Sequence, residues 1–222
     1  MKLDISSTHV EIIKLQHEMC RDQMFRDFCE TNTLPWDFTG GYEPRWYNGP
    51  VPEDVKLLFL MAEPGAITDT ERADPLPAIQ HAEWLHGYDT RKQEHYWRSN
   101  LRELCGHVWP NETEENMYRY LGGSCTFWMS LRPGKQNANV PSELEKYFLT
   151  AYLGRFLSLF PNAVLLAAGG KARTRLKKLE RLTNSSLAFD TCWAFTRPAC
   201  NQAAARESWH TAGEAIRRRL AR

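Results

Sequence analysis

Four short apolar runs, separated by segments with helical periodicity, set the organisation of this chain. They span residues 55–62, 124–131, 163–168 and 187–195. A continuous apolar run is typical of a parallel strand that is covered on both faces. Such strands alternating with helices predict an α/β fold. We expect three layers, α/β/α, around a small, mainly four-stranded parallel sheet.

The segments between these runs predict the helices. Residues 8–31 have apolar side chains such as Val10, Ile13 and Phe25 at helical spacing, which predicts one amphipathic helix. Ser142 and Glu145 have the spacing of a capping box, with Ser142 as the cap of a helix that runs to about Phe160. Further helices are expected over about 77–109, after the Gly169-Gly170 turn, and from about Ala203.

The 222 residues, 42% of them hydrophobic, are enough for one sizeable core, so we expect a single domain. Within it, residues 1–54 supply an N-terminal helix and an aromatic loop, and residues 55–220 form a core that contains the motifs described below.

Composition limits the function only weakly. The formal net charge is +1, which neither requires nor excludes a nucleic acid partner. Basic residues cluster at 171–178 and 217–222, where they form either a DNA-binding face or solvated helix faces.

The six cysteines include no C-x-x-C pair, so we expect no metal, and Cys125 and Cys192 in apolar runs are expected to be buried free thiols. No signal peptide or membrane-spanning stretch is seen, which favours a cytoplasmic protein.

Ligands of parallel sheets bind at the carboxyl ends of the strands. The candidate loops are therefore 63–69, 132–140, 169–171 and 196–202. Their sequences are Glu63-Pro64-Gly65 with Asp69 nearby, Arg132-Pro133-Gly134, Gly169-Gly170-Lys171, and Arg197-Pro198-Ala199 followed by Asn201 and Gln202.

These four motifs, in this order over about residues 55–220, resemble those of the uracil-DNA glycosylase superfamily. The resemblance implies that fold, DNA with a flipped-out nucleotide as the partner, and hydrolysis of a base–sugar bond. Four departures stand out. Met61 replaces a glycine, Leu131 replaces an iron–sulfur cysteine, Phe127 replaces the asparagine that reads uracil, and Arg197 replaces a histidine. We therefore expect no iron–sulfur cluster and no other cofactor.

The resemblance implies catalytic roles for three residues. Glu63 would position water or stabilise the sugar cation, against the alternative of a solvated loop acid. Asp69 could share that role or cap a helix. Arg197 would stabilise the departing base without giving up its proton, or bind a DNA phosphate instead.

The remaining candidates would bind the base or the DNA. Base contacts are expected from Ala62, Pro64, Gly65 and Phe127, although core packing is an equal alternative for Phe127. DNA contacts are expected from Arg132, Gly170, Lys171, Asn201 and Gln202, where Asn201 is either a polar wedge or a helix cap.

The leading prediction is a monofunctional, monomeric DNA glycosylase that leaves an abasic site. The altered base-reading positions favour a damaged or modified pyrimidine, such as a hypermodified base of phage DNA, over plain uracil, and an antiviral role is a hypothesis on that ground.

Two alternatives stay open: a glycosylase fold that binds DNA or a modified base without turnover, and an unrelated doubly wound enzyme acting on a nucleotide or sugar. The second would need a phosphate-binding fingerprint after the first strand, which Glu63-Pro64-Gly65 is not. No membrane and no obligate protein partner are expected.

Overall fold

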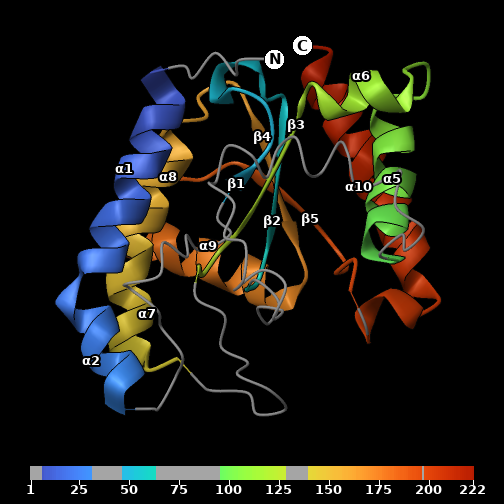
Figure 1. Ribbon diagram of the computed structural model, residues 1–222. Helices are drawn as coiled ribbons and strands as arrows, with labels where there is room; N and C mark the ends of the chain where they lie inside the picture. The colour runs from blue at the N-terminus through green and yellow to red at the C-terminus, as the bar shows by residue number, and fades with distance from the viewer. Residues whose placement is uncertain (1–6, 32–46, 64–95, 129–139, 197) are drawn as a thin grey trace.

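The computed structural model describes residues 7–31, 47–63, 96–128, 140–196 and 198–222. In Figure 1 a central sheet lies between two groups of helices. The fold class predicted from the sequence, α/β with a small parallel sheet, is confirmed at this level.

The sheet contains five strands in the order β1-β3-β2-β4-β5. They are β1 (Tyr47–Asn48), β2 (Leu57–Met61), β3 (Leu121–Cys125), β4 (Val164–Ala168) and β5 (Phe189–Cys192). The short strand β1 pairs antiparallel with β3, and the other four strands are parallel. The four expected strands are these parallel ones.

The side chains of the central strands alternate between two hydrophobic clusters, as the pleat of a strand requires. Leu58, Leu60 and Leu165 point to one cluster, and Leu57, Phe59 and Leu166 point to the other. Because both faces are covered, the strands are apolar throughout, and this is why they appear as continuous runs in the sequence.

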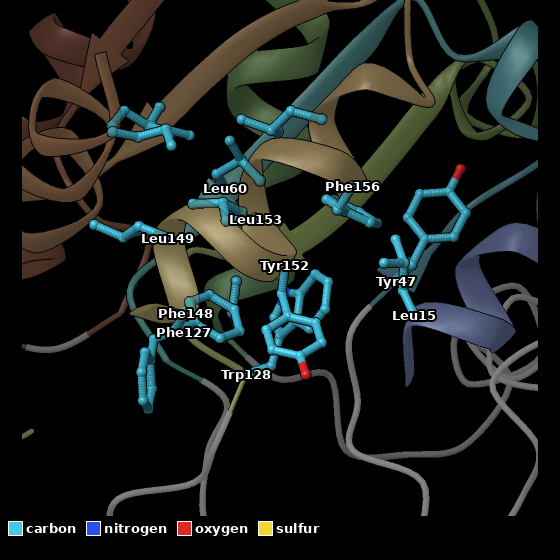
Figure 2. Packing of buried hydrophobic residues seen from close by; sticks show 14 of the residues in the cluster. Leu15, Tyr47, Leu60, Phe127, Trp128, Phe148, Leu149, Tyr152, Leu153 and Phe156 are labelled. Atoms are coloured by element: carbon cyan, nitrogen blue, oxygen red, sulfur yellow. The ribbon is translucent and has the colours of Figure 1, made fainter. Parts of the chain in front are cut away.

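The first face is covered by α1 (Ser7–Arg21), α2 (Gln23–Thr31), α7 (Ser142–Phe148), a π-helical segment η3 (Leu149–Leu153), α8 (Gly154–Ser158) and α9 (Gly170–Thr183). Aromatic rings from α7, η3 and the segment after β3 lie in this cluster (Figure 2). The single helix expected over 8–31 is two helices. The chain breaks at Asp22, whose Oδ1 accepts a hydrogen bond from the backbone N–H of Met24 at 2.9 Å and so starts α2.

The second face is covered by α5 (Tyr96–Val108) and α10 (Ala204–Leu220), with α6 (Glu114–Tyr118) beside them. Among the described residues, the 3₁₀ turns η1 (Pro52–Asp54) and η4 (Ala199–Asn201) connect elements. Gly213 of α10 lets the two long helices approach, because a Cβ there would lie 2.5 Å from the Cβ of His107. Among the described residues, no helix is long and apolar enough to cross a membrane.

The limits of β3 and the cap of α7 differ from the prediction. The strand expected over 124–131 is β3, Leu121–Cys125. It begins earlier because Gly122 and Gly123 pack under the rings of Tyr47 and Phe59. The cap of α7 is Pro141, not Ser142, and no side chain caps this helix. The carboxylate of Glu145 bonds to Arg175 and Lys178 instead of closing a capping box.

Candidate functional site

The ends of the four parallel strands form one edge of the sheet. In the β2–β3 register Met61 lies opposite Cys125, and in the β4–β5 register Ala168 lies opposite Cys192. The chain that leaves β2 at Ala62 and Glu63 therefore lies beside Thr126 and Phe127, and the turn after β4 lies beside the segment after β5. We call this edge the carboxyl edge.

The backbone that leaves β2 is tightly fixed. The carbonyl of Ala62 accepts hydrogen bonds from the N–H of Phe127 at 3.1 Å, the hydroxyl of Thr126 at 3.1 Å and Nη1 of Arg175 at 2.8 Å. Ala62, a predicted base contact, is partly buried, and its role in the described structure is to supply this acceptor. The backbone next to Glu63 is thus held by three hydrogen bonds.

The carboxylate of Glu63 faces two cations from α9. Its Oε1 accepts a hydrogen bond from Nη2 of Arg175 at 2.7 Å and lies 3.4 Å from Nζ of Lys171. The Glu63 side chain is 13% exposed. The prediction of a solvated loop acid is therefore not what the structure shows, since this carboxylate is largely buried and paired.

Arg175 connects Glu63 to a second carboxylate. Its side chain is 6% exposed, and its Nε donates to Oε2 of Glu145 at 2.9 Å. Glu145 also accepts a hydrogen bond from Nζ of Lys178 at 2.7 Å. Lys171, Glu63, Arg175, Glu145 and Lys178 thus form one chain of alternating charge, which we call the Arg175 network.

The charges of the Arg175 network reinforce one another. Burial by itself would raise the pKa of Glu145, but hydrogen bonds from Lys178 and Arg175 outweigh it and leave that pKa below its ordinary value. Glu145 therefore remains an anion at neutral pH, and together with Glu63 it compensates the charge of the buried guanidinium.

Phe127 is a core residue in this structure. Its side chain is fully buried beside Phe148 (Figure 2), and the two ring centroids lie 4.8 Å apart. The ring centroid of Phe25 lies 6.5 Å from that of Phe127, and the Arg175 guanidinium carbon lies 5.2 Å from the Phe127 centroid. A base could reach this ring only after the core around it opened. The geometry favours the core-packing interpretation over a direct base contact.

The turn after β4 requires glycine. Gly169 has φ +99°, and a Cβ there would lie 2.9 Å from the Cβ of Ala194, so the turn packs closely against the segment after β5. Gly170 then begins α9, and the side chain of Lys171 is 69% exposed. Both predicted DNA contacts therefore lie at the carboxyl edge, with Lys171 also paired to Glu63.

Asn201 and Gln202 are exposed on and just after η4. The helix-cap interpretation of Asn201 is wrong for α10, whose cap is Ala203. The remaining predicted site residues, Pro64, Gly65, Asp69, Arg132 and Arg197, lie outside the described part of the chain.

Sequence reasoning missed the two residues that organise the site. The sequence pattern places Arg175 in the basic cluster at 171–178, which is interpreted as a DNA-binding face or a solvated helix face, and Glu145 in a capping box. A signal was present, because Ala172, Leu176 and Leu179 place the apolar face of α9 around position 175. An arginine on such a face requires a buried acceptor.

Buried free thiols were expected at Cys125 and Cys192, and both are confirmed. Within the described residues, no three His, Cys, Asp or Glu side chains gather as they would around a metal ion.

Neither the models of known protein families nor the curated protein sequences include a match to this chain. Function is therefore inferred from the residues and the geometry described above.

Proposed function

We propose that the chain is a DNA glycosylase of the uracil-DNA glycosylase type, which hydrolyses the N-glycosidic bond of a flipped-out damaged or modified pyrimidine. The observation that carries the proposal is Glu63 at the end of a central parallel strand, with its carboxylate fixed by Arg175 at 2.7 Å. A fixed, largely buried anion at the carboxyl edge is what an oxocarbenium-like sugar requires opposite it.

The reaction assigns a simple task to Glu63. The bond between C1′ and the base nitrogen breaks, and its electron pair leaves with the base. Water adds to C1′ and loses a proton, and the base nitrogen gains one, so that a free base and an abasic site result. The Glu63 carboxylate would stabilise the positive sugar and orient the water.

The arrangement of the elements supports the proposal. The first and third resembling motifs lie together at the carboxyl edge, through Glu63 and the Gly169-Gly170-Lys171 turn. Lys171 is exposed beside the start of α9, where backbone N–H groups and the helix dipole favour an anion such as a DNA phosphate. A phosphate there would bring the sugar close to Glu63.

One observation favours the alternative of DNA binding without turnover. Oε1 of Glu63 is already engaged by two cations, as it would be in a purely structural ion pair. The two functions differ in a measurable way, because the binding module retains affinity for DNA but releases no base.

The test is incubation of the purified chain with a set of DNAs, followed by alkaline cleavage of abasic sites. The set includes single-stranded and duplex oligonucleotides with uracil or damaged pyrimidines, and phage DNA with and without glucosylated cytosine. Glu63→Gln removes the charge at the site. Glu143→Gln is the matched control, since Glu143 is an exposed residue that pairs with Lys146.

Cleavage of one class of DNA by the wild-type chain and by Glu143→Gln, but not by Glu63→Gln, supports the glycosylase and identifies its base. Equal cleavage of modified and unmodified phage DNA would remove the basis for an antiviral role. Binding of DNA without cleavage of any member of the set would overturn the proposal and support the binding module.

A further inference from the structure

Arg175 contacts the segment after β2, the segment after β3 and helix α7. Nη1 donates to the carbonyl of Ala62, Nη2 to Glu63, and Nε to Glu145. The guanidinium carbon lies over the ring of Phe127, which follows β3, at 5.2 Å from the ring centroid. One side chain of α9 thus links the ends of β2 and β3 with α7.

The stability of the fold does not by itself explain why an ion pair is buried here. A buried ion pair adds little to stability in comparison with apolar residues of similar volume, because both charges lose their hydration. Position 175 is surrounded by Ala172, Leu176 and Leu179, where an apolar side chain would also pack. What the guanidinium adds is a fixed orientation of the Glu63 carboxylate.

The choice of arginine follows from the directions of the three acceptors. A guanidinium is planar and presents its N–H donors in a rigid fork, whereas an ammonium is a single point of charge on a flexible stem. Only the fork can reach a carbonyl and two carboxylates at the same time in fixed directions. Glu145, itself paired with Lys178, accepts the hydrogen bond from Nε and so anchors the fork.

We propose that Arg175 is a positioning residue for Glu63, anchored by Glu145. This inference rests on the proposed glycosylase function. Within the described residues, the Glu63 side chain is held through Oε1 alone. The position of Oε1 determines where Oε2 can meet the water and the sugar, so an error of a fraction of an ångström at Arg175 is transmitted to the reacting atoms.

The experiment measures single-turnover cleavage and DNA affinity for the full chain on every DNA of the set described above. Arg175→Ala removes the fork, and Arg175→Lys keeps the charge without it. Guanidinium chloride, at millimolar concentrations far below those that denature proteins, is then added to each variant, with sodium chloride as the salt control. Arg181→Ala is the matched control, because Arg181 is exposed near the end of the same helix.

Arg175→Ala should lower the cleavage rate by about a hundredfold while the Kd for DNA is unchanged. Guanidinium should restore part of that rate, and Arg175→Lys should remain slow. Arg181→Ala should match the wild type. Rescue by guanidinium, with affinity constant throughout, is a result that a merely structural role would not produce.

If Arg175→Ala does not fold, Glu145→Gln decides, since it keeps the shape of the anchor and removes its charge. A rate lowered about tenfold at constant Kd supports the inference. A wild-type rate in Glu145→Gln, a wild-type rate in Arg175→Ala, or a loss that guanidinium does not restore overturns it while the glycosylase stands. A wild-type chain that cleaves nothing overturns both.

Discussion

Nη2 of Arg175 lies 2.7 Å from Oε1 of Glu63, although 112 residues separate them in the chain. Both side chains are largely buried, at 6% and 13% exposed. The contact joins the turn after β2 to α9, which follows β4. The pair can therefore form only when β2 and α9 have come together, so the site forms as the fold forms.

Glu63→Ala should destabilise the fold as well as remove the site carboxylate. It leaves the Arg175 guanidinium buried with one carboxylate fewer, which we expect to cost about 2 kcal/mol or more of unfolding free energy. Urea denaturation at neutral pH measures the change. Glu143→Ala, which breaks an exposed pair with Lys146, should change it by less than about 0.5 kcal/mol. Equal effects of the two variants would mean that the buried pair contributes no more to the unfolding free energy than the exposed pair does.

Stability should depend on the charge of Glu145 in acid. Burial opposes ionisation of Glu145, but Lys178 and Arg175 outweigh it, so its folded pKa lies below the ordinary 4.5. A lowered folded pKa stabilises the fold above the unfolded pKa, and this stabilisation is lost as the pH falls through the folded pKa. From about pH 5 to pH 3 the wild type should therefore lose stability more steeply than Glu145→Gln. Parallel curves from urea denaturation would contradict this.

The parallel strands could be predicted because their cause is local. The run 163–168 corresponds to β4, Val164–Ala168, because a strand buried on both faces needs a continuous run of apolar residues. The sequence of strand β3 predicts a strand less clearly. Gly122 and Gly123 have low strand propensity, and they form a strand because the rings of Tyr47 and Phe59 occupy the space beside them.

The sequence indicates that Arg175 needs a buried acceptor, but it could not predict which residues pair in the Arg175 network, because they come from three distant segments. Nothing near Glu63 in the sequence identifies its partners on α9. Likewise, Ser142 and Glu145 have the spacing of a capping box, yet Glu145 bonds to Arg175 and Lys178. Local patterns predict a local bond, and a tertiary ion pair then displaces it.

Gly169→Ala should destabilise the turn between β4 and α9. The residue has φ +99°, and a Cβ would lie 2.9 Å from that of Ala194, so we expect a loss of about 2 kcal/mol. Gly170→Ala is the control one position later, where a Cβ meets nothing within 4 Å and alanine favours the helix. Thermal unfolding of both variants measures the difference. A Gly169→Ala protein as stable as the Gly170→Ala protein would show that the turn adapts without strain.

Thiol labelling should separate the cysteines by burial. Burial raises the pKa of Cys105, with a contribution from Glu114, and that of Cys192, in each case to about 12. At pH 8 both thiols are protonated and inaccessible, so iodoacetamide should leave them unmodified in the folded chain, whereas partly exposed Cys200 should react. Mass spectrometry of the labelled peptides gives the result. Labelling of Cys105 and Cys192 at the rate of Cys200, without denaturant, would show that the core opens readily.

Phe127→Leu should lower the rate of cleavage without changing which DNA is cleaved. The ring is fully buried and supports the Arg175 guanidinium, so its loss acts on every substrate equally through Glu63. Phe156→Leu is the matched control, because Phe156 is equally buried in the same cluster and packs against Trp128 and Phe160. Relative cleavage rates for uracil-containing and modified DNAs provide the measurement. A shift in their ratio for Phe127→Leu alone would show that the ring meets the base, in which case the core must open when DNA binds.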